Sequence, residues 1–221
     1  GPNAEAAPVI RREPLFDRLV AAVKMIREAG IQPHIIPTAH GGNIDALGEY
    51  VALADSLGAT MNFSLLSAPV ENEDLSAVLP DDAALERLAQ ATLALSRDGV
   101  PVLSDTPVST RLTTTCGCGA GCTMVSVSAD GEVFPCHMMH DEAFSLGSLL
   151  EDSGCLAARH APAPRVAELG ACADCDIRYL CGGGCRARAY FATGDVEARD
   201  PYCSLVRTFY RLLFEAMLAR N

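Results

Sequence analysis

The chain has 221 residues, of which 49% are hydrophobic and 20% charged, which is typical of a folded globular protein and excludes a disordered one. Its formal net charge of -11 argues against non-specific binding to nucleic acid or to an anionic membrane, because phosphates would be repelled. No apolar run is long enough to span a bilayer and no signal-peptide core is visible, so we expect a cytoplasmic protein.

The first half of the chain alternates predicted helices and strands. The expected elements are a helix from Leu15 to Gly30, a strand at 31–38, a helix from Asn43 to Gly58, a strand at 60–67 and a helix at 83–97. Asn43 is the expected N-cap of its helix. This order predicts a parallel α/β sheet. Two strands alone do not make a well-buried parallel sheet, so this half is expected to be incomplete, with the remaining strands on the same chain or on a partner.

The pattern changes at Val108, where we place the boundary between a first domain (1–107) and a second (108–221). Alternating residues on either side of Asp130-Gly131 predict a β-hairpin. A last amphipathic helix is expected at 204–219. Little apolar periodicity is visible between Cys116 and Cys203, so packing alone would not stabilise this region, whereas bound metal would.

All ten cysteines lie in this second domain. Without a secretion signal, disulfides are improbable, and metal ligation is the favoured interpretation. Residues 172–185 read CADCDIRYLCGGGC, with the spacing C-x2-C-x5-C-x3-C. Structural zinc is an alternative, but zinc sites usually show separated pairs of cysteines rather than one dense quartet with scattered single residues. Iron–sulfur clusters prefer thiolates on close loops, and glycines let the backbone approach a cluster.

The order of these motifs resembles a known domain. The sequence CGAG from Cys118, then ADGEVFPC, LGSL, the quartet and a lone cysteine in DPYC closely resemble the SPASM domain of radical SAM maturases. The first half resembles the middle and later βα units of the radical SAM barrel in the same enzymes. The resemblance therefore implies an α/β fold, with a partial radical SAM barrel followed by a small cysteine-rich α+β SPASM domain that has a hairpin and a C-terminal helix.

The resemblance also implies two auxiliary [4Fe–4S] clusters. One would be held by Cys172, Cys175, Cys181 and Cys203. The other would use Cys136 and Cys185, together with thiols from CGCGAGC. Within that segment either Cys116 with Cys122 or Cys118 matches a known pattern, and the choice stays open; with Cys118 alone, one coordination site would be open to substrate. Cys155 matches no pattern and is expected to be a buried or unligated thiol.

The sequence departs from the family in one large respect. The C-x3-C-x2-C motif that holds the SAM-reducing cluster does not occur, since Val125 stands where the third cysteine after Cys118 and Cys122 would be. S-adenosylmethionine is therefore expected to bind only with the missing N-terminal half of the barrel, in cis or in trans. We expect this chain to be inactive alone.

By resemblance, the complete enzyme would modify a ribosomally made peptide or protein through radical chemistry, with ferredoxin or flavodoxin as a possible electron donor. One alternative is maturation of haem, another tetrapyrrole or another cofactor, because the segment CRARAYFATGDVEARDPYC resembles such proteins as well. Another is a non-catalytic electron-transfer or precursor-binding partner of a separate radical SAM chain.

Several other residues could have either a structural or a functional role. His137 and His140 flank Cys136 and are expected mainly as hairpin-end polar residues; a histidine at 137, where sulfatase-maturating relatives have a carboxylate, argues against that reaction. Met138 and Met139 are expected in packing.

His34 and His40 lie in or after the first strand, and His40 falls at a strand end where α/β barrels place their sites. Arg186 and Arg188 are expected either to pair with acidic groups, to donate to cluster sulfides or to be structural.

Overall fold

A computed structural model describes residues 15–67, 77–97, 102–115, 117–150 and 163–219. The chain forms two compact units, Gly1–Leu112 with Tyr202–Asn221, and Thr113–Pro201. The sequence predicted a boundary after residue 107, and the structure divides the chain after Leu112. No helix in the described parts of the chain has both the length and the apolar character that crossing a membrane requires.

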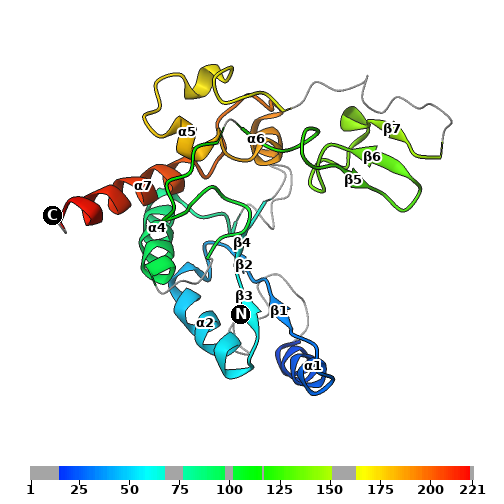
Figure 1. The fold of residues 1–221 in the computed structure, drawn as a ribbon, viewed down its shortest axis with the longest axis vertical. Coiled ribbons are helices and arrows are strands. Elements are labelled where there is room, and N and C mark those ends of the chain that lie inside the picture. Colours follow the sequence, from blue (N-terminus) through cyan, green and yellow to red (C-terminus); the bar gives the residue numbers. More distant parts are fainter. Residues whose placement is uncertain (1–14, 68–76, 98–101, 116, 151–162, 220–221) are drawn as a thin grey trace. The chain divides into compact units, whose positions relative to one another are not determined.

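The first unit contains short parallel strands followed by helices (Figure 1). The strands are β1 (His34–Ile35), β2 (Thr38–Ala39), β3 (Thr60–Met61) and β4 (Ser64–Leu65). β1 pairs with β3, and β2 pairs with β4, both in parallel. Each predicted strand is therefore observed as two short ones. Pro37 lies between β1 and β2 and has no N–H to donate to the ladder, although its carbonyl accepts from Ser64 at 3.1 Å.

The named strands of the first unit lie in the two predicted strand regions, and one isolated bridge adds to them. Leu103 forms a parallel bridge with Phe63, and the Phe63 N–H donates to the Val102 carbonyl at 2.7 Å. Residues 102–104 therefore add a third extended segment beside the line of β3 and β4. This segment was not predicted, because the described residues 102–104 show no apolar alternation in the sequence.

The predicted helices of the first unit are confirmed. They are α1 (Phe16–Glu28), the 3-10 turn η2 (Ile44–Ala46) with α2 (Leu47–Ser56), α4 (Asp82–Arg97) and α7 (Cys203–Leu218). α4 and α7 pack against one another (Figure 1), and Leu88 of α4 and Phe209 of α7 are fully buried. α7, which the sequence analysis assigned to the second domain, thus belongs to the compact first unit.

The second unit has a three-stranded antiparallel sheet in the order β5–β6–β7. Its strands are β5 (Ser126–Val127), β6 (Glu132–Phe134) and β7 (Gly147–Ser148). The hairpin predicted around Asp130-Gly131 is confirmed, and Gly131 adopts a φ of +87°, which suits glycine in a tight turn.

Short helical segments complete this unit. They are the 3-10 turns η3 (Glu142–Phe144) and η5 (Gly170–Cys172) and the helices α5 (Arg178–Cys181) and α6 (Arg186–Thr193). The sequence analysis missed α5 and α6. In α6, Arg186 and Arg188 are buried with Ala187 and Ala189, so the usual contrast between apolar and charged faces is absent.

Candidate metal centre

Three cysteines from separate segments of the second unit share one apolar cluster. Ala120, Cys136, Met139 and Ala187 are its buried residues, and Cys118 and Cys185 pack against it. The backbone helps to join the first two cysteine segments, because the Gly121 N–H donates to the Pro135 carbonyl at 3.0 Å. The structure therefore gathers Cys118, Cys136 and Cys185, three of the thiols predicted for one cluster, around a common core.

The structure describes only one of the two other cysteines in the CGCGAGC segment. Cys122 is exposed, in the turn that follows Ala120. Cys116 lies outside the described residues, as does Cys155. The apolar cluster described above therefore includes Cys118, and the structure leaves the predicted pair Cys116 and Cys122 untested as ligands.

The first three thiols of CADCDIRYLCGGGC lie on local turns. Cys172 ends η5, and the Cys175 N–H donates to the Cys172 carbonyl at 3.1 Å. Cys181 ends α5, with its N–H donating to Ile177. Cys203, predicted as the fourth ligand of this group, is the first residue of α7 in the first unit.

The three glycines before Cys185 all adopt left-handed backbone conformations, with φ of +71° for Gly182, +89° for Gly183 and +74° for Gly184. Side chains would be strained there. A Cβ at Gly183 would also lie 2.5 Å from Leu169 Cδ1, and one at Gly184 would lie 2.7 Å from the Asp200 carboxylate. These glycines let the backbone approach other parts of the protein closely; the prediction that they also let it approach a cluster stays a prediction.

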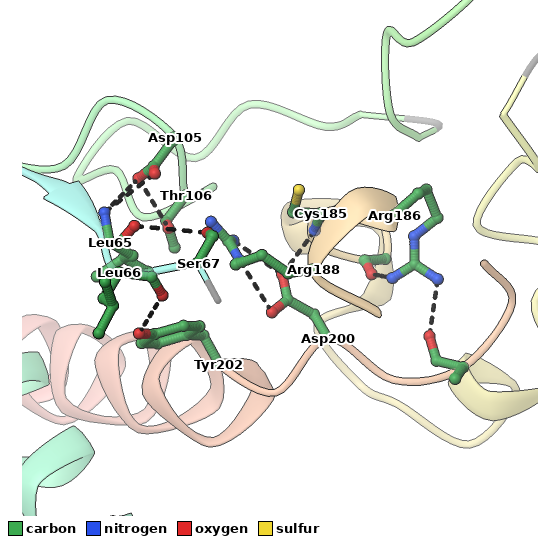
Figure 2. A network of polar contacts seen from close by, with 12 residues as sticks. Leu65, Leu66, Ser67, Asp105, Thr106, Cys185, Arg186, Arg188, Asp200 and Tyr202 are labelled. Carbon is green, nitrogen blue, oxygen red and sulfur yellow. Dashed lines mark hydrogen bonds and ion pairs between the residues drawn. The ribbon is translucent and has the colours of Figure 1, made fainter. Parts of the chain in front are cut away.

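Asp200 lies at the centre of the hydrogen bonds that hold Cys185 (Figure 2). One of its carboxylate oxygens accepts from the Cys185 N–H at 2.6 Å and from the Arg188 guanidinium at 2.8 Å. The other accepts from Arg188 Nε at 3.2 Å. Burial raises the pKa of the Cys185 thiol, and the positive charge of Arg188 opposes that shift.

These contacts separate the alternatives for the two arginines. Arg188 forms a buried ion pair with Asp200, so the acidic-partner prediction is confirmed for it. Arg186 donates to the carbonyls of Gly183, Val196 and Ala198 and is therefore structural in these three contacts. Its Nε is buried and has no hydrogen-bond partner.

Sequence reasoning missed Asp200. The only signal was that buried arginines would need a counter-charge. Asp195, Glu197 and Asp200 all follow the arginines in the sequence, and spacing alone does not distinguish them. In the structure Asp195 and Glu197 are exposed, while Asp200 is buried.

The histidines near Cys136 have different environments. His140 stacks on Phe134 with 4.4 Å between ring centroids, and its Nε2 hydrogen-bonds to the Ser126 hydroxyl at 2.8 Å. The hairpin-end interpretation is thus confirmed for His140. His137 Nδ1 lies 3.8 Å from Cys136 Sγ, so His137 adjoins the candidate thiol. Met139 is buried in the apolar cluster and Met138 packs against it, as predicted.

In the first unit, Asn43 is the N-cap residue of η2, as predicted, but its side chain makes no capping hydrogen bond to that helix. Its Oδ1 instead accepts from the backbone N–H of His40 at 2.8 Å, and its Nδ2 donates to the Thr38 carbonyl. Asn43 therefore fixes the turn after β2. His40 is buried there, its Nδ1 accepts from the Gly42 N–H, and burial lowers the pKa of its imidazole. His34, by contrast, is exposed and bonds to Thr60 and Asn62.

The gathered thiols suit a thiolate-ligated group, and the orphaned Nε of Arg186, one residue after Cys185, supplies a buried donor of the kind that cluster sulfides accept. In the described residues, however, no three His, Cys, Asp or Glu side chains are close enough to hold one metal ion. The cysteine assignments therefore stay predictions, although the donor chemistry fits.

Known proteins that resemble this chain are maturases and related enzymes. No model of a protein family matches the chain. It is 29% identical over 217 residues to a mycofactocin maturase, MftC, of Mycolicibacterium smegmatis, covering 92% of this chain and 55% of that protein. It is 29% identical over 217 residues to a PqqA peptide cyclase of Granulibacter bethesdensis (90% and 56%). An AdoMet-dependent heme synthase of Methanosarcina barkeri is 28% identical over 235 residues (92% and 65%).

Solved structures share the fold. The structure of native anSMEcpe with bound AdoMet superposes with a TM-score of 0.70 at 13% identity, over 93% of this chain and 61% of that one. Streptococcus suis SuiB bound to S-adenosylmethionine gives a TM-score of 0.56 at 17% identity, over 86% and 49%. The chain thus has homologues among radical SAM maturases, and it spans about half the length of the curated relatives it matches.

Proposed function

We propose that this chain is the C-terminal part of a radical SAM/SPASM maturase and carries two auxiliary [4Fe–4S] clusters. The single observation that carries the proposal is the apolar cluster that Cys118, Cys136 and Cys185 share, in a chain that aligns with a mycofactocin maturase and a PqqA peptide cyclase over about nine-tenths of its length. The proposed ligands are drawn from Cys116, Cys118, Cys122, Cys136, Cys172, Cys175, Cys181, Cys185 and Cys203.

For the cluster that contains Cys136, we propose Cys118 as the ligand from CGCGAGC. Cys118 packs against the same core as Cys136 and Cys185, whereas Cys122 is exposed. Three protein thiolates would leave one iron coordination site for substrate. When bound, auxiliary clusters of this kind supply electron uptake or substrate binding. The role of the chain's own residues is to hold thiolates in a partly dry, apolar setting.

The proposed substrate of the complete enzyme is a ribosomally made peptide or protein. One of the relatives above, the PqqA peptide cyclase, is named for a peptide substrate. The electron donor would be a ferredoxin or flavodoxin. S-adenosylmethionine would bind only with the other half of the barrel, because the chain lacks C-x3-C-x2-C.

The first unit supports the proposal that more barrel is needed. α1 has no buried residue, and its Leu19 and Met25 are 52% and 68% exposed. Within the described residues, β1 pairs only with β3. Apolar helix surface and an unpaired strand edge are features that further barrel strands and helices would cover.

A cofactor-maturing enzyme is the second candidate, and the observation that favours it is the 28% identity to an AdoMet-dependent heme synthase over 92% of this chain. A non-catalytic partner of a separate radical SAM chain is the third. A C-x3-C-x2-C sequence encoded immediately upstream in the same gene would eliminate the third candidate. A short precursor gene nearby would favour the peptide substrate over the tetrapyrrole.

Anaerobic purification followed by iron, sulfide and zinc analysis tests the proposal. We expect a brown protein with about eight irons and a similar amount of sulfide for each chain. Stoichiometric zinc without sulfide would overturn the proposal. Cys122→Ser serves as a matched control for Cys118→Ser: the latter should lower the iron content, and the former should not.

A further inference from the structure

Cys185 differs from its neighbours in how its backbone is held. The N–H groups of Cys172 and Cys175 donate to carbonyls three residues earlier, within local turns. The N–H of Cys185 instead donates to the Asp200 carboxylate, fifteen residues later, at 2.6 Å. A hydrogen bond to a charged acceptor is among the stronger kinds in proteins, so this contact fixes the start of α6 more firmly than a turn does.

Asp200 is itself held in one orientation. Its side chain is 4% exposed and pairs with the Arg188 guanidinium, whose side chain is 1% exposed. Because Arg188 approaches both carboxylate oxygens, the carboxylate plane is fixed by two donors. The backbone at Gly184 passes so close to Asp200 that no side chain fits between them.

A second arginine ties the same loop to the same later segment. Arg186 donates to the Gly183 carbonyl on one side and to the Val196 and Ala198 carbonyls on the other, the latter two at 2.8 Å. Residues 183–185 are thus joined to residues 196–200 by two buried arginines and one buried carboxylate. All these contacts lie in the second unit and involve protein groups only.

We propose that Asp200 is a positioning residue for Cys185, which it holds in place before any cluster binds. This inference rests on the proposed function, in which Cys185 is a cluster ligand. It distinguishes Cys185 within the quartet: its N–H donates to a buried carboxylate fifteen residues later, whereas the N–H groups of Cys172 and Cys175 donate within local turns.

The test uses the whole chain with Asp200→Asn, which keeps the size of the side chain but removes its charge. Asp195→Asn is the matched control, because Asp195 is an exposed aspartate of the same segment that also accepts a backbone N–H, from Glu197 at 2.8 Å. Amide hydrogen exchange is measured on the iron-free chain, with the Leu146 amide, which donates to Val133, as an internal reference for folding.

We expect the Cys185 amide to be protected in the parent chain and in Asp195→Asn, and to exchange about ten- to hundredfold faster in Asp200→Asn. Leu146 should stay protected in all three. If Asp200→Asn also exposes Leu146, Arg188→Lys replaces it, since that change keeps the charge and removes the two-pronged contact. An unprotected Cys185 amide in the parent chain would overturn the proposal, as would equal exchange in every variant.

Iron reconstitution then tests whether the positioning acts on the ligand. Asp200→Asn should lose about half of the iron of the parent and change the electron paramagnetic resonance spectrum of the cluster that Cys185 holds. Normal iron content and an unchanged spectrum, despite fast amide exchange, would refute the link between Asp200 and the ligand. A parent chain that binds no iron and sulfide would refute the proposed function instead, while the exchange experiment would still decide whether Asp200 holds the Cys185 backbone.

Discussion

Replacing Thr92 by valine should stabilise the first unit. Thr92 is fully buried in α4, on the same face as the buried Leu85 and Leu88, and its hydroxyl has no hydrogen-bond partner. A buried hydroxyl without a partner costs roughly 1–3 kcal/mol. Valine has nearly the same shape and is also β-branched, so the helix itself should not suffer. We expect the free energy of unfolding to rise by about 1–2 kcal/mol, which raises the midpoint temperature by roughly 2–8 °C.

Urea unfolding of the iron-free chain, followed by far-ultraviolet circular dichroism, measures this change. Thr92→Ser keeps the hydroxyl and removes a buried methyl, so it should lower stability by about 1 kcal/mol. Thr193→Val is the matched control, because the Thr193 hydroxyl donates to the Ala189 carbonyl at 2.8 Å and its removal should not stabilise. A Thr92→Val chain no more stable than the parent would show that the hydroxyl does have a partner in solution and would refute the reasoning.

Three further predictions concern other parts of the chain. Tyr202→Phe should lower the free energy of unfolding by about 1–3 kcal/mol, because the buried hydroxyl donates to the Leu66 carbonyl at 2.7 Å (Figure 2); an unchanged urea midpoint would contradict this. Stability should fall as the pH drops below 6.5, since burial lowers the pKa of His40 and the unfolded chain then binds a proton that the folded chain resists; His40→Gln should flatten this part of the stability–pH profile, and an equal slope in both would refute it. Cys181→Ala should remove about four irons and lower the thermal stability of the iron-loaded chain, whereas full iron content would exclude Cys181 as a ligand.

Sequence patterns predicted the helices and strands of the first unit, but not α5, α6 or several individual contacts. The helices α2, α4 and α7 follow from apolar spacing, which reports the face that each helix buries; α1 has the same spacing, although none of its residues is buried. The bridge between Phe63 and Leu103 is too short to leave a periodic pattern. Asn43 is at the predicted N-cap position, but the sequence does not show whether its side chain bonds to the helix or, as here, back to His40.

In the candidate site, too, the sequence did not predict the contacts between residues. The cysteine spacing predicts candidate ligands, which stay predictions, and it gives no information on how the protein holds them. Asp200 became visible only when the fold placed it against Cys185 and Arg188, and the glycines at 182–184 proved to be required by close contacts with other residues. Pairing over fifteen residues depends on the path of the chain, which spacing does not encode.

The predicted ligands differ in how firmly the protein holds their backbones, and this affects how the site would assemble. A ligand whose backbone is fixed by buried hydrogen bonds loses little further conformational freedom when it binds metal, whereas a ligand on a local turn must be ordered by the binding itself. Cys185, whose N–H donates to the buried Asp200, is of the first kind, and Cys136 is itself buried in the apolar cluster. Cys172 and Cys175 are closer to the second kind, because their N–H groups donate within local turns, although Arg199 also donates to the carbonyl of the neighbouring Ala171. Under the proposed function, the cluster that uses Cys136 and Cys185 would therefore bind to a largely formed site. The cluster that uses Cys172 and Cys175 would bind with a larger ordering cost, so its loss on iron chelation should come first.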